Sequence, residues 1–187
     1  MKGMWQMWES CVPPDICDQI VQEGKSRPSQ VAGISLNTTV VPGIRKSDIA
    51  WISYGDEVFD DIWRFIERKF YEANANAFGL DINYLNSLQF TNYKSTDEGH
   101  YDWHEDVFWE KNSPSSRKLS MVIQLSDPSE YTGGNLELKL SQPPDVNTLR
   151  KKGTLIVFPS FVLHRVTKVE SGERNSLVAW MEGPNWR

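Results

Sequence analysis

The sequence predicts a mainly β protein with helices near its N-terminus, an α+β fold built around a jelly roll. Helical periodicity is confined to the first 80 residues, which we expect to form a helical support. Over residues 81–187, short runs rich in β-branched and aromatic residues alternate with clusters of Gly, Pro, Ser, Asp and Asn. Because no helical segment separates these runs, an antiparallel sandwich or barrel is favoured. Without a repeat or a linker, residues 1–187 are expected to be a single domain.

Two segments have the spacing of apolar residues that is typical of amphipathic helices. Pro14 opens the first, which we expect over residues 15–23, with Gly24 as its end. The second covers residues 58–78, where most apolar side chains recur in steps of three and four, and Gly79 closes it. Both helices would bury one face against the β core.

Six runs in the second part of the chain are predicted to be strands. Turn-forming clusters such as Thr132-Gly133-Gly134 separate them. The basic run Arg150-Lys151-Lys152 is short, and we interpret it as a solvated turn before a strand. The predicted strands are residues 84–93, 117–125, 136–140, 153–158, 164–169 and 176–180.

Composition narrows the classes of function. Lys and Arg number 20 against 25 Asp and Glu, a net charge of -5, which argues against a binder of nucleic-acid backbones. No apolar run is long enough to span a membrane, and the N-terminus lacks the apolar segment of a secretion signal. Cys11 and Cys17 are interpreted as two reduced thiols. These features predict a cytoplasmic protein.

The chain has three histidines, and two of them lie in a pattern that suggests a metal site. His104 and Asp106 are two residues apart, so both side chains point to one face of an extended segment. His164 begins a later predicted strand and could approach the same ion from elsewhere in a barrel. Two imidazoles and a carboxylate can bind one face of an octahedral metal, as in non-haem Fe(II) oxygenases. Asp102 is a rival carboxylate, and His100 is interpreted as a solvated loop histidine.

Arg174 and Ser176 form a second pair with a spacing of two. On a strand, the guanidinium and the hydroxyl would face the same side and could hold an organic acid, because arginine binds a carboxylate through two parallel hydrogen bonds. The alternative is a surface arginine that pairs with Glu173 in a turn. Arg174 follows His164 by ten residues, and this position favours an arginine that binds an organic acid beside the metal.

Together these residues resemble the 2-oxoglutarate/Fe(II)-dependent dioxygenases, specifically their prolyl 4-hydroxylase-like branch. The resemblance covers most of the chain and is loose over residues 1–40. It implies a double-stranded β-helix core of the cupin-like kind. Upstream, Gly43 to Trp51 resembles the strand that enters this domain. The other stretches that carry the resemblance are Tyr93, Tyr101 to Asp106, Arg117 to Leu125, Gly133 to Leu136, Gly153 to Pro159, His164 to Val169 and Gly172 to Trp180.

The resemblance also implies a set of ligands. Its cofactor is Fe(II) and its cosubstrates are 2-oxoglutarate and O2, with ascorbate as a candidate reductant. The metal ligands would be His104, Asp106 and His164. The distal carboxylate of 2-oxoglutarate would pair with Arg174.

Further positions match cosubstrate contacts of the family. Tyr93 would donate a hydrogen bond to 2-oxoglutarate, and Ser176 would assist the arginine. Gln124 stands where relatives often have a tyrosine that contacts the distal carboxylate, and an amide could make the same bond. Arg117 either faces substrate or starts a strand, and we favour the second. Three aromatic residues line the pocket or belong to an ordinary aromatic core: Tyr101, Trp103 and Trp180.

The implied activity is hydroxylation coupled to conversion of 2-oxoglutarate to succinate and CO2. A peptidyl, most naturally prolyl, substrate is our first hypothesis, and a free amino acid or other small metabolite is the close alternative. A catalytically silent metal-binding jelly roll is a rival from another class, although such a module would typically have lost a ligand or the arginine. A zinc hydrolase would not need the arginine. The oligomeric state is left open.

Overall fold

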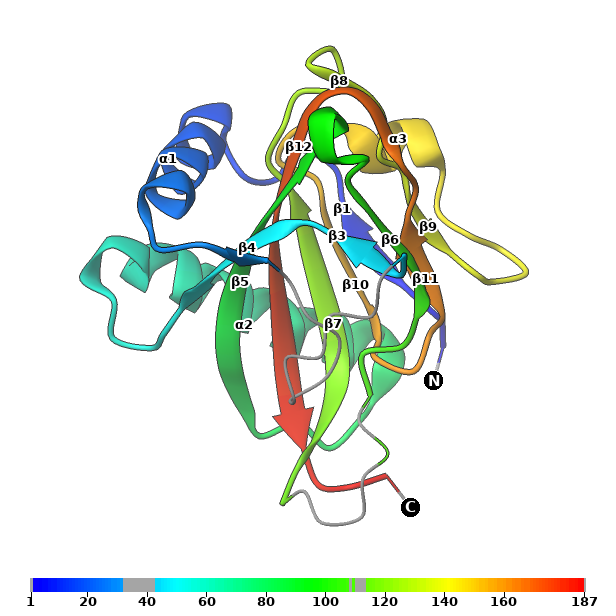
Figure 1. Cartoon of the computed structure of the whole chain (residues 1–187). Coiled ribbons are helices and arrows are strands. Elements are labelled where there is room, and N and C mark those ends of the chain that lie inside the picture. Colours follow the sequence, from blue (N-terminus) through cyan, green and yellow to red (C-terminus); the bar gives the residue numbers. More distant parts are fainter. Residues whose placement is uncertain (1, 32–42, 108, 110–113, 187) are drawn as a thin grey trace.

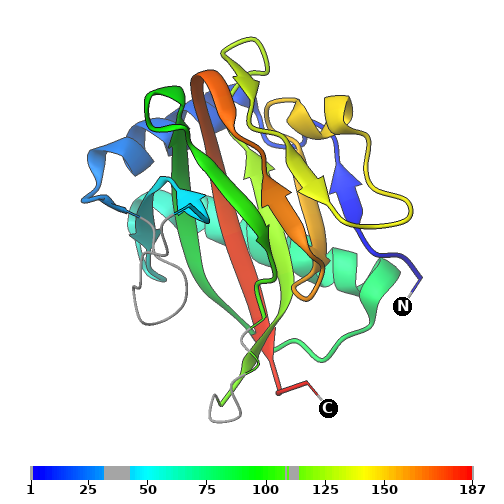
Figure 2. The ribbon, with the colours of Figure 1, turned by 45° about the vertical axis from the view of Figure 1, so that its right-hand side comes forward.

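The computed structural model describes residues 2–31, 43–107, 109 and 114–186. Two antiparallel sheets face each other, and helices cover the outer side of the larger sheet (Figure 1, Figure 2). This arrangement confirms the predicted β fold with a jelly-roll core. Within the described part of the chain, no helix is both long and apolar enough to cross a membrane.

The larger sheet has the order β1-β10-β7-β12-β5-β4-β2, with β8 paired to β12, and the smaller sheet has the order β3-β6-β11-β9. Every pairing is antiparallel. The strands are β1 (Gln6–Trp8), β2 (Gln30–Val31), β3 (Arg45–Lys46), β4 (Asp48–Ile52), β5 (Tyr84–Lys94), β6 (His100–His104), β7 (Ser116–Gln124), β8 (Tyr131–Gly133), β9 (Leu136–Leu138), β10 (Leu155–Pro159), β11 (His164–Val166) and β12 (Val169–Gly183).

The helices are α1 (Pro14–Ser26), α2 (Asp60–Ala73) and α3 (Val146–Arg150). A 3-10 turn (Glu57–Phe59) leads into α2 and a π-helical turn (Asn74–Phe78) continues it. Gly79 then ends the segment with a left-handed φ of 62°, as predicted, because a side chain is strained in that conformation.

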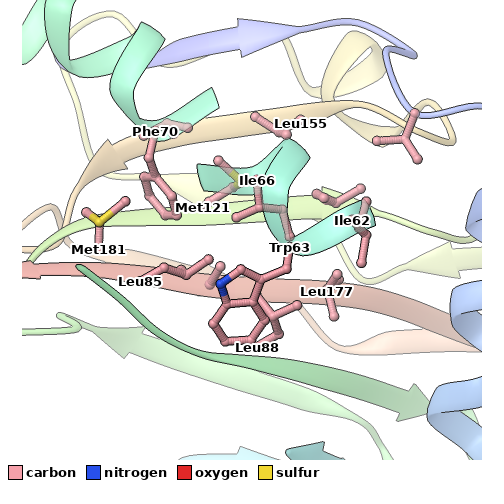
Figure 3. Close-up of a cluster of buried hydrophobic side chains, with 14 of the residues drawn as sticks. Ile62, Trp63, Ile66, Phe70, Leu85, Leu88, Met121, Leu155, Leu177 and Met181 are labelled. Carbon is pink, nitrogen blue, oxygen red and sulfur yellow. The ribbon is translucent and has the colours of Figure 1, made fainter. Parts of the chain in front are cut away.

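The main core lies between α2 and the larger sheet (Figure 3). The apolar face of α2 meets side chains from four neighbouring strands, all of which point to the same side of the sheet because side chains alternate along a strand. The residues drawn in Figure 3 include Ile62, Trp63, Ile66 and Phe70 from α2, Leu85 and Leu88 from β5, Met121 from β7, Leu155 from β10, and Leu177 and Met181 from β12.

Side chains of β12 alternate between the two faces of the larger sheet, and the two faces have different roles. Leu177, Ala179 and Met181 face the helices and are almost fully buried. Arg174 and Ser176 point the other way, into the space between the two sheets. The same strand therefore stabilises the fold on one face and positions polar groups on the other.

Gly24 was predicted to end the first helix, and this prediction is wrong. The helix continues to Ser26, and Arg27 follows it with an extended backbone. A Cβ atom added at Gly24 would lie 2.3 Å from Cγ of the Phe90 ring, so the glycine allows α1 to approach β5 closely. Pro28 explains the helix end better, because the residue before a proline avoids the helical region.

Gly24→Ala is expected to destabilise the protein by about 1–3 kcal/mol. The Phe90 ring is buried and must move to admit a methyl group, and this overpacking outweighs the roughly 1 kcal/mol gain in helix propensity. Urea unfolding would measure the change, with Gln22→Ala on the exposed side of α1 as the matched control. A Gly24→Ala protein as stable as the parent would contradict this account of the contact.

Two further expectations need correction. The first 80 residues are not only a helical support. Besides β3 and β4, which coincide with the strand implied for residues 43–51, they supply β1 and β2, and β1 pairs with β10. Arg150 is not in a solvated turn. It ends α3 and donates hydrogen bonds to the carbonyl oxygens of Gly133 and Tyr131 and to Oδ1 of Asn135. This arginine holds the loop after β8 in place.

Candidate functional site

Three residues from two segments of the chain bring their ligand atoms together between the sheets: His104 ends β6, Asp106 follows it, and His164 begins β11. His104, Asp106 and His164 have ligand atoms within 4.8 Å of one another, and they are the group that could hold a metal ion among the described residues. Nε2 of His104 lies 3.8 Å from Oδ1 of Asp106, and Nε2 of His164 lies 3.6 Å from Oδ2. The pairing of β11 with β6 sets His164 directly opposite His104.

Backbone carbonyls fix the tautomer of both histidines. Nδ1 of His104 lies 2.7 Å from the carbonyl oxygen of Asp102, and Nδ1 of His164 lies 2.9 Å from that of Val162. A carbonyl oxygen can only accept, so each Nδ1 carries the proton and each Nε2 presents a lone pair. Such hydrogen bonds to the outer nitrogen are typical of metal-binding histidines.

Asp106 is held by its backbone and its side chain. Its amide donates to the carbonyl oxygen of Ser160 at 2.9 Å. Oδ2 accepts a 2.6 Å hydrogen bond from the Ser120 hydroxyl, which itself lies 2.9 Å from the Ser160 hydroxyl. Both serines are fully buried, so this network fixes the carboxylate without solvent.

Charge and burial keep the cluster in the protonation states that a metal needs. Burial alone would raise the pKa of Asp106, but His164, His104, Arg117 and the Ser120 hydrogen bond outweigh it and hold that pKa below its usual value. Burial, and then the neighbouring His164, lowers the pKa of His104 to about 3. The carboxylate is therefore charged and His104 neutral near pH 7.

Aromatic rings pack on both histidines. Tyr101 stacks on His104 with ring centroids 3.4 Å apart and an interplanar angle of 11°, and Phe158 meets His164 edge-on at 4.8 Å. Burial raises the pKa of Tyr101 to about 12, so its phenol stays protonated. These contacts limit rotation of the imidazoles.

Arg174 lies in the same space and is only 1% exposed. Its Nη2 donates to Oε1 of Gln124 at 2.9 Å, its Nη1 lies 3.5 Å from the Ser176 hydroxyl, and its guanidinium carbon is 5.4 Å from the centre of the Tyr93 ring. Pairing of β12 with β5 sets Arg174 opposite Tyr93. The alternative of a surface arginine paired with Glu173 is wrong, because Glu173 pairs with Lys25 instead.

One cavity of about 490 Å³ joins the histidine cluster to Arg174. Six of the seven predicted site residues line it, and Gln124, the seventh, contacts Arg174 without lining it. The lining residues predicted from the sequence are Tyr93, His104, Asp106, His164, Arg174 and Ser176.

Some of the aromatic and cationic residues considered as pocket residues line the cavity, and one does not. Tyr101 and Trp180 line the cavity, whereas Trp103 does not and packs under Arg165. Arg117 is the second residue of β7, as the favoured interpretation expected, and it also lines the cavity, with its guanidinium 3.8 Å from the Trp180 ring centre. Burial lowers the pKa of Arg117, against the opposing effect of Asp106.

The two residues set aside near the cluster stay outside it. The exposed Asp102 accepts a hydrogen bond from the amide of Trp103 and does not face the other ligands. His100 is the first residue of β6 rather than part of a loop, and its ring nitrogens lie near the carbonyl oxygens of Glu98 and Gly43. It takes no part in the cluster.

Three residues of the site were missed in the sequence. Ser120 is the only short polar side chain between apolar neighbours in the middle of β7, and that break in the apolar pattern could have pointed to it. Arg45 and Gln89 also line the cavity, on β3 and β5. Nothing local marks them, since their position depends on which strands are neighbours.

Comparisons with known proteins agree with this geometry. Residues 88–182, about half of the chain, match the family model of the 2OG-Fe(II) oxygenase superfamily. A PKHD-type hydroxylase of Synechococcus sp. (strain CC9311) is 37% identical over 90 residues, which is 48% of this chain and 39% of the relative. One from Hyphomonas neptunium is 41% identical over 64 residues, 34% of this chain and 28% of the relative. The matched segment thus spans well under half of these relatives.

Solved structures with the same fold include prolyl hydroxylases. A Pseudomonas putida prolyl-4-hydroxylase has a TM-score of 0.74 at 22% identity, covering 97% of this chain and 93% of the other. A Trichoplax adhaerens prolyl hydroxylase, solved with a peptide of the hypoxia inducible factor oxygen degradation domain, has a TM-score of 0.76 at 15% identity, covering 95% and 82%. At these identities the likeness shows the fold. The match to the family model, which spans every predicted site residue, shows that the chain belongs to the 2OG-Fe(II) oxygenase superfamily.

Proposed function

We propose that this protein is an Fe(II)- and 2-oxoglutarate-dependent dioxygenase. His104, Asp106 and His164 would hold Fe(II), and Arg174 would bind the distal carboxylate of 2-oxoglutarate, with Tyr93, Ser176 and Gln124 beside it. In this proposal residues 1–187 act as one domain.

The observation that carries the proposal is a buried guanidinium without a counter-ion. Arg174 is 1% exposed, and no carboxylate of the described residues pairs with it. Its Nε and the Gln124 Nε2 are buried and lack hydrogen-bond partners in the described part of the chain. An unpaired buried charge is costly, so the site suits an anionic ligand that accepts from several donors.

The donor set at the other end of the cavity suits Fe(II). Two imidazoles and one carboxylate are the ligands of the facial triad and leave further metal positions for exogenous ligands. When bound, Fe(II) and 2-oxoglutarate would supply the oxidising chemistry of hydroxylation, with succinate and CO2 as products. The chain turns Nε2 of both imidazoles toward the metal position by binding each Nδ1 to a backbone carbonyl, and it orients the carboxylate through Ser120.

For the substrate, we propose a prolyl residue of a peptide, and a free amino acid or small metabolite as the alternative. The hydroxylase relatives and the prolyl hydroxylase structures support the first. The cavity wall formed by Trp180 and Trp51, with ring centroids 5.9 Å apart, also offers flat apolar surface to a proline ring.

The free thiols of Cys11 and Cys17 support a cytoplasmic setting.

Anaerobic addition of Fe(II) and 2-oxoglutarate tests the proposed chemistry. A weak visible charge-transfer band should appear, and succinate should form once oxygen, ascorbate and a substrate are added. Proline-containing peptides compared with free amino acids would then separate the two substrate hypotheses. Failure to form the band and absence of succinate under every aerobic condition would instead support a silent metal-binding module.

Ser120→Ala is expected to weaken metal binding about 10- to 100-fold, because outer hydrogen bonds to a metal ligand contribute on that scale. Calorimetric titration with Mn(II) measures the change without turnover. Ser160→Ala is the matched control: it keeps the Ser120–Asp106 hydrogen bond and should have a smaller effect. Equal affinities of the Ser120→Ala protein and the parent would show that the backbone alone orients Asp106.

A further inference from the structure

Arg45 is a cation in the cavity wall that the proposed chemistry does not use. It lies on β3, and Gln89, which also lines the cavity, lies on β5 of the facing sheet. Nη2 of Arg45 donates to Oε1 of Gln89 at 2.9 Å, and Nε donates to the Ser47 hydroxyl at 2.9 Å. Both partners are neutral, so they orient the guanidinium without cancelling its charge.

The position of Arg45 relates it directly to the proposed metal. Its guanidinium carbon lies 4.5 Å from the centre of the Tyr101 ring, and Tyr101 in turn stacks on His104. The three groups form a stack that ends at a proposed iron ligand. A ligand that contacts Arg45 inside the cavity therefore lies close to the metal.

Charge balance shows what kind of ligand the cavity lacks. In the proposed loaded site, Asp106 and the two carboxylates of 2-oxoglutarate balance Fe(II) and Arg174. The negative charge of Glu182 stabilises the positive charge of Arg117. The other acidic lining residue, Glu105, is exposed and accepts a hydrogen bond from Trp109. No carboxylate of the described residues pairs with Arg45, and its Nη1 has no hydrogen-bond partner among them.

A second donor lies in the same wall. The indole nitrogen of Trp180 is buried and lacks a hydrogen-bond partner in the described part of the chain. Trp180 lines the cavity together with Arg45. A polar ligand group would satisfy donors that the protein itself leaves unpaired, and a carboxylate would also neutralise the guanidinium.

We propose that Arg45 is a specificity-determining residue that binds a carboxylate of the substrate, beside the carbon that is hydroxylated. This rests on the proposed function and narrows its substrate class. The carboxylate has two sources: the α-carboxylate of a free or C-terminal amino acid, or an acidic side chain next to the target residue in a peptide. The chemistry recognised is the same in both.

Equilibrium binding to protein loaded with Mn(II) and 2-oxoglutarate, without oxygen, tests this independently of turnover. The probes are L-proline against L-prolinamide, and a blocked peptide with Pro-Glu against its Pro-Gln counterpart. Tryptophan fluorescence can report binding, since Trp51 and Trp180 line the cavity. In at least one pair the carboxylate member should bind about 10- to 100-fold more tightly, as a hydrogen-bonded charge contributes about 1.5–3 kcal/mol. The pair that shows the difference identifies the source.

The variants separate recognition from a structural role. Arg45→Met should reduce the preference for the carboxylate member to less than about twofold, while Arg45→Lys should keep part of it because the charge remains. Affinities for Mn(II) and 2-oxoglutarate should not change in either variant. Equal binding within both pairs, or a preference that persists in Arg45→Met, overturns the proposal. Failure of the proposed function is distinct, because wild-type protein would then show no charge-transfer band before any probe is added.

Discussion

His164→Ala protein is expected to bind Fe(II) at least about 100-fold more weakly than the wild type and to form no charge-transfer band with 2-oxoglutarate. Structural zinc sites with four ligands contribute about 10–16 kcal/mol, or about 3 kcal/mol per ligand, which corresponds to about 100-fold in affinity. His164 is one of the three proposed ligands, and its Nε2 lies 3.6 Å from Oδ2 of Asp106. Succinate formation should therefore fall to background.

Titration with Co(II), followed by its visible absorption, measures the affinity directly. The third histidine offers a matched control, because His100 lies on β6 with His104 but takes no part in the cluster. His100→Ala should bind metal as the wild type does. Wild-type affinity in the His164→Ala protein would show that the metal binds elsewhere.

Arg174→Met is expected to weaken 2-oxoglutarate binding by about 100- to 4000-fold while metal affinity stays unchanged. Removing one partner of a buried ion pair costs about 3–5 kcal/mol. Arg174 is almost fully buried, so solvent does not screen its interaction with the ligand. The ligand-free variant should be at least as stable as the wild type, since the substitution removes a buried charge that no carboxylate of the described residues pairs with.

Thermal unfolding with and without 2-oxoglutarate separates the two effects. A ligand that binds only the folded state raises its stability by about 2.7 kcal/mol at 100 times its Kd, and this increase should disappear in Arg174→Met. Arg165→Met serves as the control, because Arg165 pairs with Glu137 outside the cavity. If 2-oxoglutarate still stabilised Arg174→Met as strongly as the wild type, the proposed role of Arg174 would be wrong.

The sequence was sufficient for features that depend on local pattern. The steps of three and four before Gly79 predicted a helix that is present, and the turn-separated runs predicted strands β5, β7 and β10 with small errors at their ends. The strand predicted over residues 176–180 is present as part of β12, which is much longer. The spacing of two in His104–Asp106 and in Arg174–Ser176 predicted pairs on one face, and each pair lines the cavity. Local geometry decides these features, because side chains in a strand alternate between its two faces.

The wrong expectations concern contacts between distant segments. Gly24 looked like a helix end, but a glycine stands there because the Phe90 ring on β5 leaves no space for a side chain. Arg150 looked solvated, but it holds the loop after β8. In both cases the partner is more than fifteen residues away in the chain, so composition around the residue carries no sign of it.

The sequence by itself identified the residues that could bind a metal ion and an organic acid. It could do so because each kind of binding needs particular side chains at particular local spacings. Only the tertiary structure decided that β11 sets His164 opposite His104, that β12 buries Arg174 away from every described carboxylate that could pair with it, and that β3 brings Arg45 into the same cavity. Strand order and register follow from the packing of the whole core. A shift of one residue in any of these pairings would turn the site residues to the opposite face.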